Sequence, residues 1–166
     1  RDRLDDKNVL KHISKLSGVP LPKRSLSASE KESYRLQARR SELLEAANTF
    51  FIDCLSHKDN EHAKSPRARQ LREYLIQNRK FDITKFRLPE ADHSRQSTKM
   101  EIGFMPGLKT LNQHLRNKGY HQGEIQEAIK LPKAIGHSHT LTVPYRNKIG
   151  VIKGFVFRDI NHRSGS

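Results

Sequence analysis

The stretch PYRNKIGVIKGFVFRD, residues 144–159, decides the fold class of this chain because the spacing of its apolar residues changes there. Val143 and Tyr145 end an alternating run, Asn147 and Lys148 supply a turn, and a second alternating run follows over residues 151–157. Alternation on both sides of a short polar turn predicts a β-hairpin. The chain before it shows helical spacing, so we predict an α+β fold in which a helical N-terminal part precedes a small antiparallel sheet.

The hairpin carries more positive charge than it can pair within itself. Its cations are Arg146, Lys148, Lys153 and Arg158, and its one acidic residue is Asp159. Cations that follow a phosphate backbone, together with rings on which bases stack, are typical of proteins that bind single-stranded nucleic acid without sequence preference. Tyr145 is the aromatic residue that we expect to contact the nucleic acid. We expect Phe155 and Phe157 to be buried, because a small sheet must pack against the helices.

Composition also indicates a polyanionic partner. The 166 residues include 32 Lys and Arg against 18 Asp and Glu, a formal net charge of +14 at pH 7. A surplus of this size favours binding to a polyanion. Cys54 is the only cysteine, which excludes a disulfide within the chain and a zinc site built on cysteine pairs. No apolar run approaches the length of a membrane span, so we expect a cytoplasmic protein with no membrane partner.

Two helix starts are marked by capping residues. Ser27 and Glu30 have the spacing of a capping box, which predicts a long helix from there to about Leu55. Ser65 followed by Pro66 predicts the next start. The buried face of this second helix is expected to carry Ala68, Leu71, Leu75 and Ile76.

Two shorter helices are expected before the hairpin. Leucines at 108, 111 and 115 have helical spacing, and Gly119 is placed to end that helix in a left-handed conformation. Residues 122–130 predict the last helix, with Ile125 and Ile129 buried. We further expect a short turn after Asp82 and a polar surface loop over residues 89–99.

The chain divides into three expected segments. Residues 1–26 are predicted to be an extended lead-in with a short helix over residues 8–16. Residues 27–160 form the folded domain, and residues 161–166 resemble a cloning-tag remnant. The chain begins without methionine, and we expect it to be a piece of a larger polypeptide.

A second basic set accompanies the helix that starts at Pro66. Its candidate ligand-binding members are Arg69, Arg72 and Arg79. Arg69 and Arg72 are three residues apart and so share a helix face. A charged face opposite an apolar stripe is also what any solvent-exposed helix shows, so this set leaves both interpretations open.

Four segments, in this order, resemble the bacterial DnaG-type DNA primases. They are SELLEAANTFF (41–51), LREYLIQNR (71–79), EIGFMPG (101–107) and TVPYRNKIGVIKGFVFR (142–158). The last follows the family hairpin pattern x-x-x-P-I-x-x-x-x-G-x-x-x-G-F-x-x-R in register. The matching residues are Pro144, Gly150, Gly154, Phe155 and Arg158. The arginine-rich run that family members carry before this hairpin is replaced here by HSHT, residues 137–140.

The resemblance implies that residues 27–160 are the N-terminal subdomain of the primase RNA polymerase region, in a divergent primase of a phage or mobile element. In the family this subdomain precedes the catalytic Toprim fold and contacts template. Arg79 lies one residue later than the arginine of the family. The resemblance and the charge pattern together nominate nucleic-acid-binding residues: Arg146, Lys148, Lys153, Arg158, Arg79, Arg69, Arg72 and Tyr145.

The resemblance places the catalytic groups outside this chain. Primases of this type use Toprim carboxylates, including an Asp-x-Asp pair, to hold divalent metal against a nucleoside triphosphate. No Asp-x-Asp occurs in the sequence. We therefore expect no catalytic residue, metal ligand or cofactor here, with Mg or Mn in a Toprim domain and zinc in a further module of the parent polypeptide.

Two functions from different classes follow. The first is a subdomain that binds single-stranded DNA template for RNA primer synthesis during DNA replication, in a replisome at the nucleoid, with the replicative helicase as a further partner in the primosome. The alternative is a protein-interaction adaptor of a mobile-element replication protein that docks on a helicase. Whether the chain is an enzyme by itself is left open, because nucleotidyl transfer would depend on the Toprim carboxylates.

Overall fold

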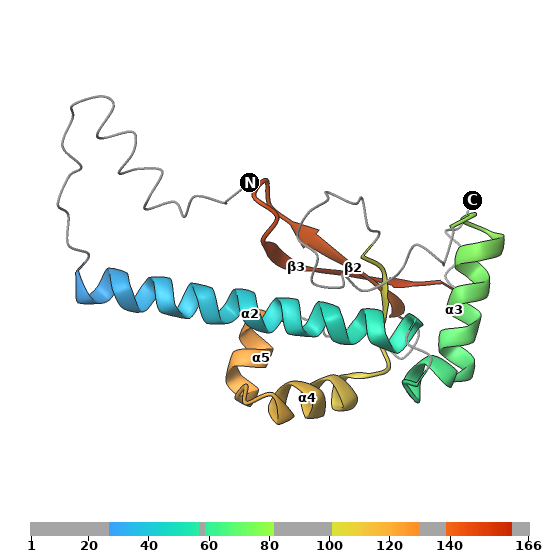
Figure 1. Cartoon of the computed structure of the whole chain (residues 1–166), viewed down its shortest axis with the longest axis horizontal. Helices are drawn as coiled ribbons and strands as arrows, with labels where there is room; N and C mark the ends of the chain where they lie inside the picture. Colours follow the sequence, from blue (N-terminus) through green and yellow to red (C-terminus); the bar gives the residue numbers. More distant parts are fainter. Residues whose placement is uncertain (1–26, 57–58, 82–100, 130–138, 161–166) are drawn as a thin grey trace, which may run out of the picture. The chain divides into compact units, whose positions relative to one another are not determined.

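The computed structural model describes residues 27–56, 59–81, 101–129 and 139–160 (Figure 1). The chain divides into two compact units, Arg1–Arg35 and Leu36–Ser166. Four expected features lie outside the described residues: the lead-in helix over residues 8–16, the turn after Asp82, the loop over residues 89–99 and the segment 161–166.

Helix α2 (Ala28–Ser56) begins at the predicted capping box. The Ser27 hydroxyl accepts a hydrogen bond from the Glu30 amide at 3.2 Å, and the Glu30 carboxylate accepts one from the Ser27 amide at 2.9 Å. These two bonds satisfy backbone donors that the helix itself leaves without acceptors. The predicted start and the predicted end near Leu55 are both confirmed.

The apolar face of α2 is the centre of the core in the second unit. Its buried members are Leu43, Leu44, Ala47, Phe50, Phe51, Ile52, Cys54 and Leu55. The Phe50 ring stacks on His114 of α4 (Leu108–Asn117) with centroids 4.2 Å apart, whereas the Phe51 ring meets Phe155 of the hairpin edge-on at 5.2 Å. Consecutive phenylalanines therefore contact different neighbours, and in Figure 1 the hairpin and α4 lie on opposite sides of α2.

Helix α3 (Pro66–Gln77) starts as predicted, with the Ser65 hydroxyl accepting a hydrogen bond from the Ala68 amide at 3.2 Å. Ala68, Leu71 and Leu75 are buried as expected. The prediction that Ile76 is buried is wrong, because its side chain is 48% exposed. Leu75 occupies the buried position on that turn, and the next residue lies about 100° further round the helix.

The two short helices also form where the sequence predicts them. Helix α4 ends before Gly119, whose φ of +88° is the left-handed conformation expected of a glycine at that position. Helix α5 (Gln122–Ala128) follows, and Ile125 and Ile129 are buried. Leu111 and Leu115 are buried too, whereas Leu108, at the first turn of α4, is 43% exposed.

The sheet has three antiparallel strands in the order β1-β2-β3. Strands β2 (His139–Arg146) and β3 (Ile152–Asp159) form the predicted hairpin. Strand β1 (Gly103–Phe104) pairs with β2 and was not predicted. Two residues are too few to show a periodic pattern, so no sequence signal marked this strand. The α+β class, with helices before strands, is confirmed.

The hairpin turn depends on Asn147 and Gly150. The Asn147 side-chain oxygen accepts hydrogen bonds from the Ile149 and Val151 amides at 3.2 and 2.9 Å, and Gly150 has a φ of +83°. Beyond the turn, Arg146 pairs with Ile152 but Tyr145 pairs with Gly154, so β3 has one extra residue at this point. Such a β-bulge changes which residues share a face.

The bulge changes the face on which Ile152 lies. Strict alternation places Ile152 on the face that carries Gly154, Val156 and Arg158. Ile152 is instead 1% exposed and belongs to the core. From Gly154 onward the alternation holds: Phe155 and Phe157 pack against Phe51, as predicted, and the opposite face of the hairpin is turned away from α2.

Candidate nucleic-acid interface

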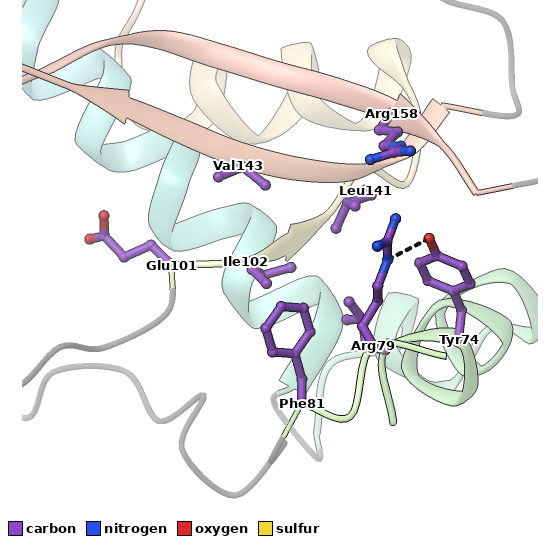
Figure 2. A pocket seen from close by; sticks show the side chains of 9 residues that line it. Tyr74, Arg79, Phe81, Glu101, Ile102, Leu141, Val143 and Arg158 are labelled. Atoms are coloured by element: carbon purple, nitrogen blue, oxygen red, sulfur yellow. Dashed lines mark hydrogen bonds between the residues drawn. The ribbon is translucent and has the colours of Figure 1, made fainter. Parts of the chain in front are cut away.

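A pocket of about 390 Å³ lies where the outer face of the hairpin meets the end of α3. Its lining residues are Tyr74, Leu75, Arg79, Phe81, Glu101, Ile102, Leu141, Val143 and Arg158. Figure 2 shows the pocket with the side chains of α3 and of the segment after it on one side and those of the hairpin on the other. Two predicted nucleic-acid-binding residues, Arg79 and Arg158, are thereby brought together from positions far apart in the sequence.

Arg79 is held in place by a tyrosine. Its Nε donates a hydrogen bond to the Tyr74 hydroxyl at 2.9 Å, and its guanidinium carbon lies 5.6 Å from the centroid of the Tyr74 ring. This contact orients the guanidinium and leaves its two terminal nitrogens without a protein acceptor in the described part of the chain. Arg79 is therefore positioned before any ligand arrives, which lowers the entropic cost of binding.

Arg158 enters the pocket from β3, opposite Leu141 of β2. In Figure 2 Arg158 comes from the hairpin side of the pocket and Arg79 from the α3 side, and their guanidiniums lie at the same end of it. Neither arginine has a carboxylate partner within the described ranges 27–56, 59–81, 101–129 and 139–160. Two guanidiniums that face one pocket repel each other, so an anion between them relieves the repulsion.

Glu101 is the acidic residue of the lining, but its charge is engaged elsewhere. Arg146 donates from Nε to one Glu101 oxygen and from Nη2 to the other, both at 2.6 Å. In Figure 2 the Glu101 carboxylate is directed away from Arg79 and Arg158. It therefore does not neutralise the two arginines of the pocket.

Arg146 is a hairpin cation that finds its partners outside the hairpin strands. Besides Glu101, it donates to both carboxylate oxygens of Glu45 on α2 and to the Gly150 carbonyl in the turn. Hydrogen bonds to these two carboxylates raise the pKa of the Arg146 guanidinium. Its donors are thus committed to joining the hairpin to α2, and it is not a free cation for phosphate.

Arg72 also has an internal role. Its Nη1 donates to the Leu55 carbonyl at the end of α2 and to the Ala63 carbonyl, both at 2.8 Å. Carbonyls at a helix end have no partner within the helix, so a cation placed there is stabilising. Burial, aided by the nearby charge of Arg69, lowers the pKa of Arg72. Arg72 therefore has a structural contact, and the assignment of Arg69 and Arg72 to a nucleic-acid-binding surface stays a prediction.

The remaining nominated residues are exposed but do not converge. Arg69, Lys148 and Lys153 are exposed, and none has an ion-pair partner in the part of the chain that the structure describes. Lys153 lines a separate small pocket of about 120 Å³ together with Arg40 of α2. Nothing in the structure tests whether these residues contact nucleic acid, so those assignments stay predictions.

The sequence did not predict the aromatic and aliphatic residues that line the pocket. Tyr74, Phe81, Leu141 and Val143 were not candidates, because aromatic and aliphatic side chains at such positions are ordinary core residues. No spacing rule marked Tyr74, because Arg79 lies after the end of α3 and residues five apart are not neighbours on a helix face.

The described residues contain neither a metal-binding cluster nor a membrane-spanning helix. No group of three or more His, Cys, Asp or Glu side chains there could hold a metal ion. Among the same residues, no helix combines the length and the apolar character needed to cross a membrane.

Comparison with known proteins identifies no family. The chain matches no family model, no curated protein and no solved structure. The pocket geometry and the motifs in the sequence are therefore the two sources for a functional proposal.

Proposed function

We propose that this chain binds single-stranded DNA through the pocket that contains Arg79 and Arg158, as the template-binding subdomain of a DnaG-type primase. The single observation that supports DNA binding is the convergence of these two arginines without a carboxylate between them. The primase assignment depends on the resemblance of the sequence motifs.

The chemistry of the pocket suits a phosphodiester. A guanidinium presents a planar set of donors that matches phosphate oxygens, and two of them can contact one phosphate or two neighbouring ones. Beside them, Leu141 and Val143 form an apolar wall. A nucleotide can meet both, with its phosphate at the arginines and its base against the apolar wall, whereas a free inorganic anion would contact the arginines only.

The same two residues connect the pocket with the resemblance. Arg158 matches the last position of the family hairpin pattern, and Arg79 matches, one residue late, the arginine that ends the tyrosine-leucine helix. We expect the chain alone to bind template without making primer, because the Toprim carboxylates of the family are not in this sequence.

The test is binding of a fluorescently labelled, unstructured oligothymidylate, followed by anisotropy at several salt concentrations. If about six phosphates are contacted, the logarithm of affinity should fall with the logarithm of salt at a slope near −4. Replacing Arg158→Ala should weaken binding about fivefold to tenfold at low salt and make the slope shallower by about 0.7, since one phosphate contact is lost.

Arg116→Ala is the matched control. Arg116 is an exposed arginine of α4 that does not line the pocket, so this variant loses the same charge at a different place. Equal weakening by both substitutions would mean that only net charge matters and would reject the pocket. Weak association without salt dependence would instead favour the adaptor function.

A further inference from the structure

The outer face of the hairpin exposes an apolar strip beside the arginine pocket. Three cross-strand pairs form it: Tyr145 with Gly154, Val143 with Val156, and Leu141 with Arg158. Tyr145 is 63% exposed, Val156 59% and Val143 37%. Exposed aromatic and β-branched residues gathered on one sheet face indicate a binding surface, because isolated domains rarely leave such groups together in water.

Tyr145 has the surroundings of a stacking platform. Its ring contacts no other ring among the residues that the structure describes. Its cross-strand neighbour is Gly154, and a Cβ added to Gly154 would meet nothing within 4 Å. Residues directly opposite in an antiparallel pair normally cover each other's side chains. Here the glycine leaves the space beside the tyrosine ring open for a flat group.

The charges around the strip favour a ligand that is a polyanion and also carries planar groups. Lys148 lies in the turn beyond Tyr145, and Arg158 and Arg79 lie at the other end of the strip. None of the six residues that form the strip is acidic. Tyr145 and Leu141 are four residues apart on β2, about 13 Å at the usual rise of a strand. Cations at both ends of an aromatic and aliphatic strip are the arrangement by which proteins hold single strands without sequence preference.

We propose that Tyr145 stacks on a nucleobase in the space left open by Gly154, and that the bound single strand runs along the outer face of the hairpin from Tyr145 to the arginine pocket. This inference rests on the proposed DNA binding and adds to it a base subsite and a path. The ring supplies base contact that is independent of charge, whereas Arg79 and Arg158 supply the phosphate contacts.

The experiment compares two labelled strands of equal length, oligothymidylate and the same strand with abasic sites, on the full chain and its variants. Tyr145→Ala should weaken oligothymidylate binding about fivefold or more, in the range found for loss of one stacked base. Its salt slope should equal that of the wild type, because no charge is removed. The preference of the wild type for the base-bearing strand should disappear in this variant.

Two further variants separate stacking from folding. Tyr145→Phe keeps the ring and should bind like the wild type. Gly154→Val should reproduce the loss, because its side chain covers the ring, while the protein should stay folded in thermal unfolding, since a Cβ at this position meets nothing within 4 Å. Gly154→Val therefore keeps the proposal testable if Tyr145→Ala fails to fold.

Each outcome distinguishes the base subsite from the DNA binding on which it rests. No salt-dependent binding by the wild type would overturn both. Binding that depends on Arg158 but not on Tyr145 or Gly154 would overturn the stacking subsite alone. Loss of self-association in Tyr145→Ala, measured by light scattering, together with unchanged DNA binding, would assign the strip to contact between two copies and would also overturn the subsite.

Discussion

At the scale of single residues, Gly103 lies at a close approach of β1 to α2. A Cβ at this position would lie 2.4 Å from the Cβ of Phe51, 2.7 Å from the Phe51 carbonyl carbon and 2.7 Å from the Thr142 hydroxyl. Two of these atoms belong to a buried helix and cannot move away independently. Glycine is needed here because β1 packs directly on α2, and the same packing places Glu101, two residues earlier, beside Arg146.

We predict that Gly103→Ala destabilises the protein by about 1–3 kcal/mol, the range for overpacking a well-packed core. The measurement is the free energy of unfolding in urea. Gly154→Ala is the control, because it also adds one methyl group to a strand glycine but meets nothing within 4 Å. Similar stabilities for Gly103→Ala and the control would show that the sheet can shift away from α2.

At the scale of elements, one ion pair fastens α5 to α2. Arg39 of α2 donates to both carboxylate oxygens of Glu124 and to the Gly119 carbonyl, and its guanidinium carbon lies 5.3 Å from the centre of the Tyr120 ring. The Glu124 carboxylate also accepts a hydrogen bond, at 2.7 Å, from the backbone amide of His121. His121 is the N-cap of α5, so this bond satisfies a backbone donor at the start of the helix. These hydrogen bonds lower the pKa of Glu124 from 4.5 to about 2. The bond from Arg39 has the larger effect and the bond from the His121 amide the next largest.

This shift predicts how stability depends on pH. The folded state holds the Glu124 proton less tightly than the unfolded chain, so acid favours unfolding. The contribution of Glu124 is complete above its unfolded pKa near 4.5 and is lost as pH falls toward 2. Glu124→Gln should therefore be less stable than the wild type at neutral pH, and the difference should shrink across this window.

Thermal unfolding at a series of pH values measures the difference. Glu127→Gln is the control, because Glu127 is an exposed glutamate of the same helix without a partner of its own among the described residues. A difference between wild type and Glu124→Gln that stays constant down to the lowest pH would contradict the assigned cause.

At the scale of the whole molecule, Arg146 joins three segments that are far apart in the sequence. Its partners Glu101 and Glu45 are 45 and 101 residues away, and the Gly150 carbonyl belongs to its own hairpin turn. The two glutamates would repel each other without it. The hairpin that carries Tyr145 and Arg158 is thereby fixed to the helical part of the second unit.

We predict that Arg146→Met destabilises the protein by about 1–3 kcal/mol, because it leaves the partly buried Glu101 beside the exposed Glu45 without a counter-charge. Adding Glu101→Gln should restore part of the loss, since one of the repelling charges is removed. Lys148→Met is the control, an exposed cation two residues further on that should change stability by no more than about 0.5 kcal/mol. An Arg146→Met variant within that limit would show that the cluster is not stabilising.

Features that depend on neighbouring residues were predictable. The capping box of Ser27 and Glu30, the start at Ser65 and the left-handed Gly119 each depend on atoms within a few residues of one another. The alternation around Asn147 likewise predicted the hairpin. The bulge that buries Ile152 was not predictable, because it is a property of how two strands pair and not of either strand alone.

The sequence by itself determined the α+β class, the helix starts, the hairpin and the surplus of positive charge. Only the tertiary structure decided which cations of the hairpin have no carboxylate partner among the described residues. Arg146 and Arg158 are both basic residues of the same two strands, yet Arg146 is bound by glutamates and Arg158 faces a pocket with Arg79. The reason is that side-chain charge is paired through space, between residues that folding brings within about 3 Å, and sequence separation carries no information about that distance.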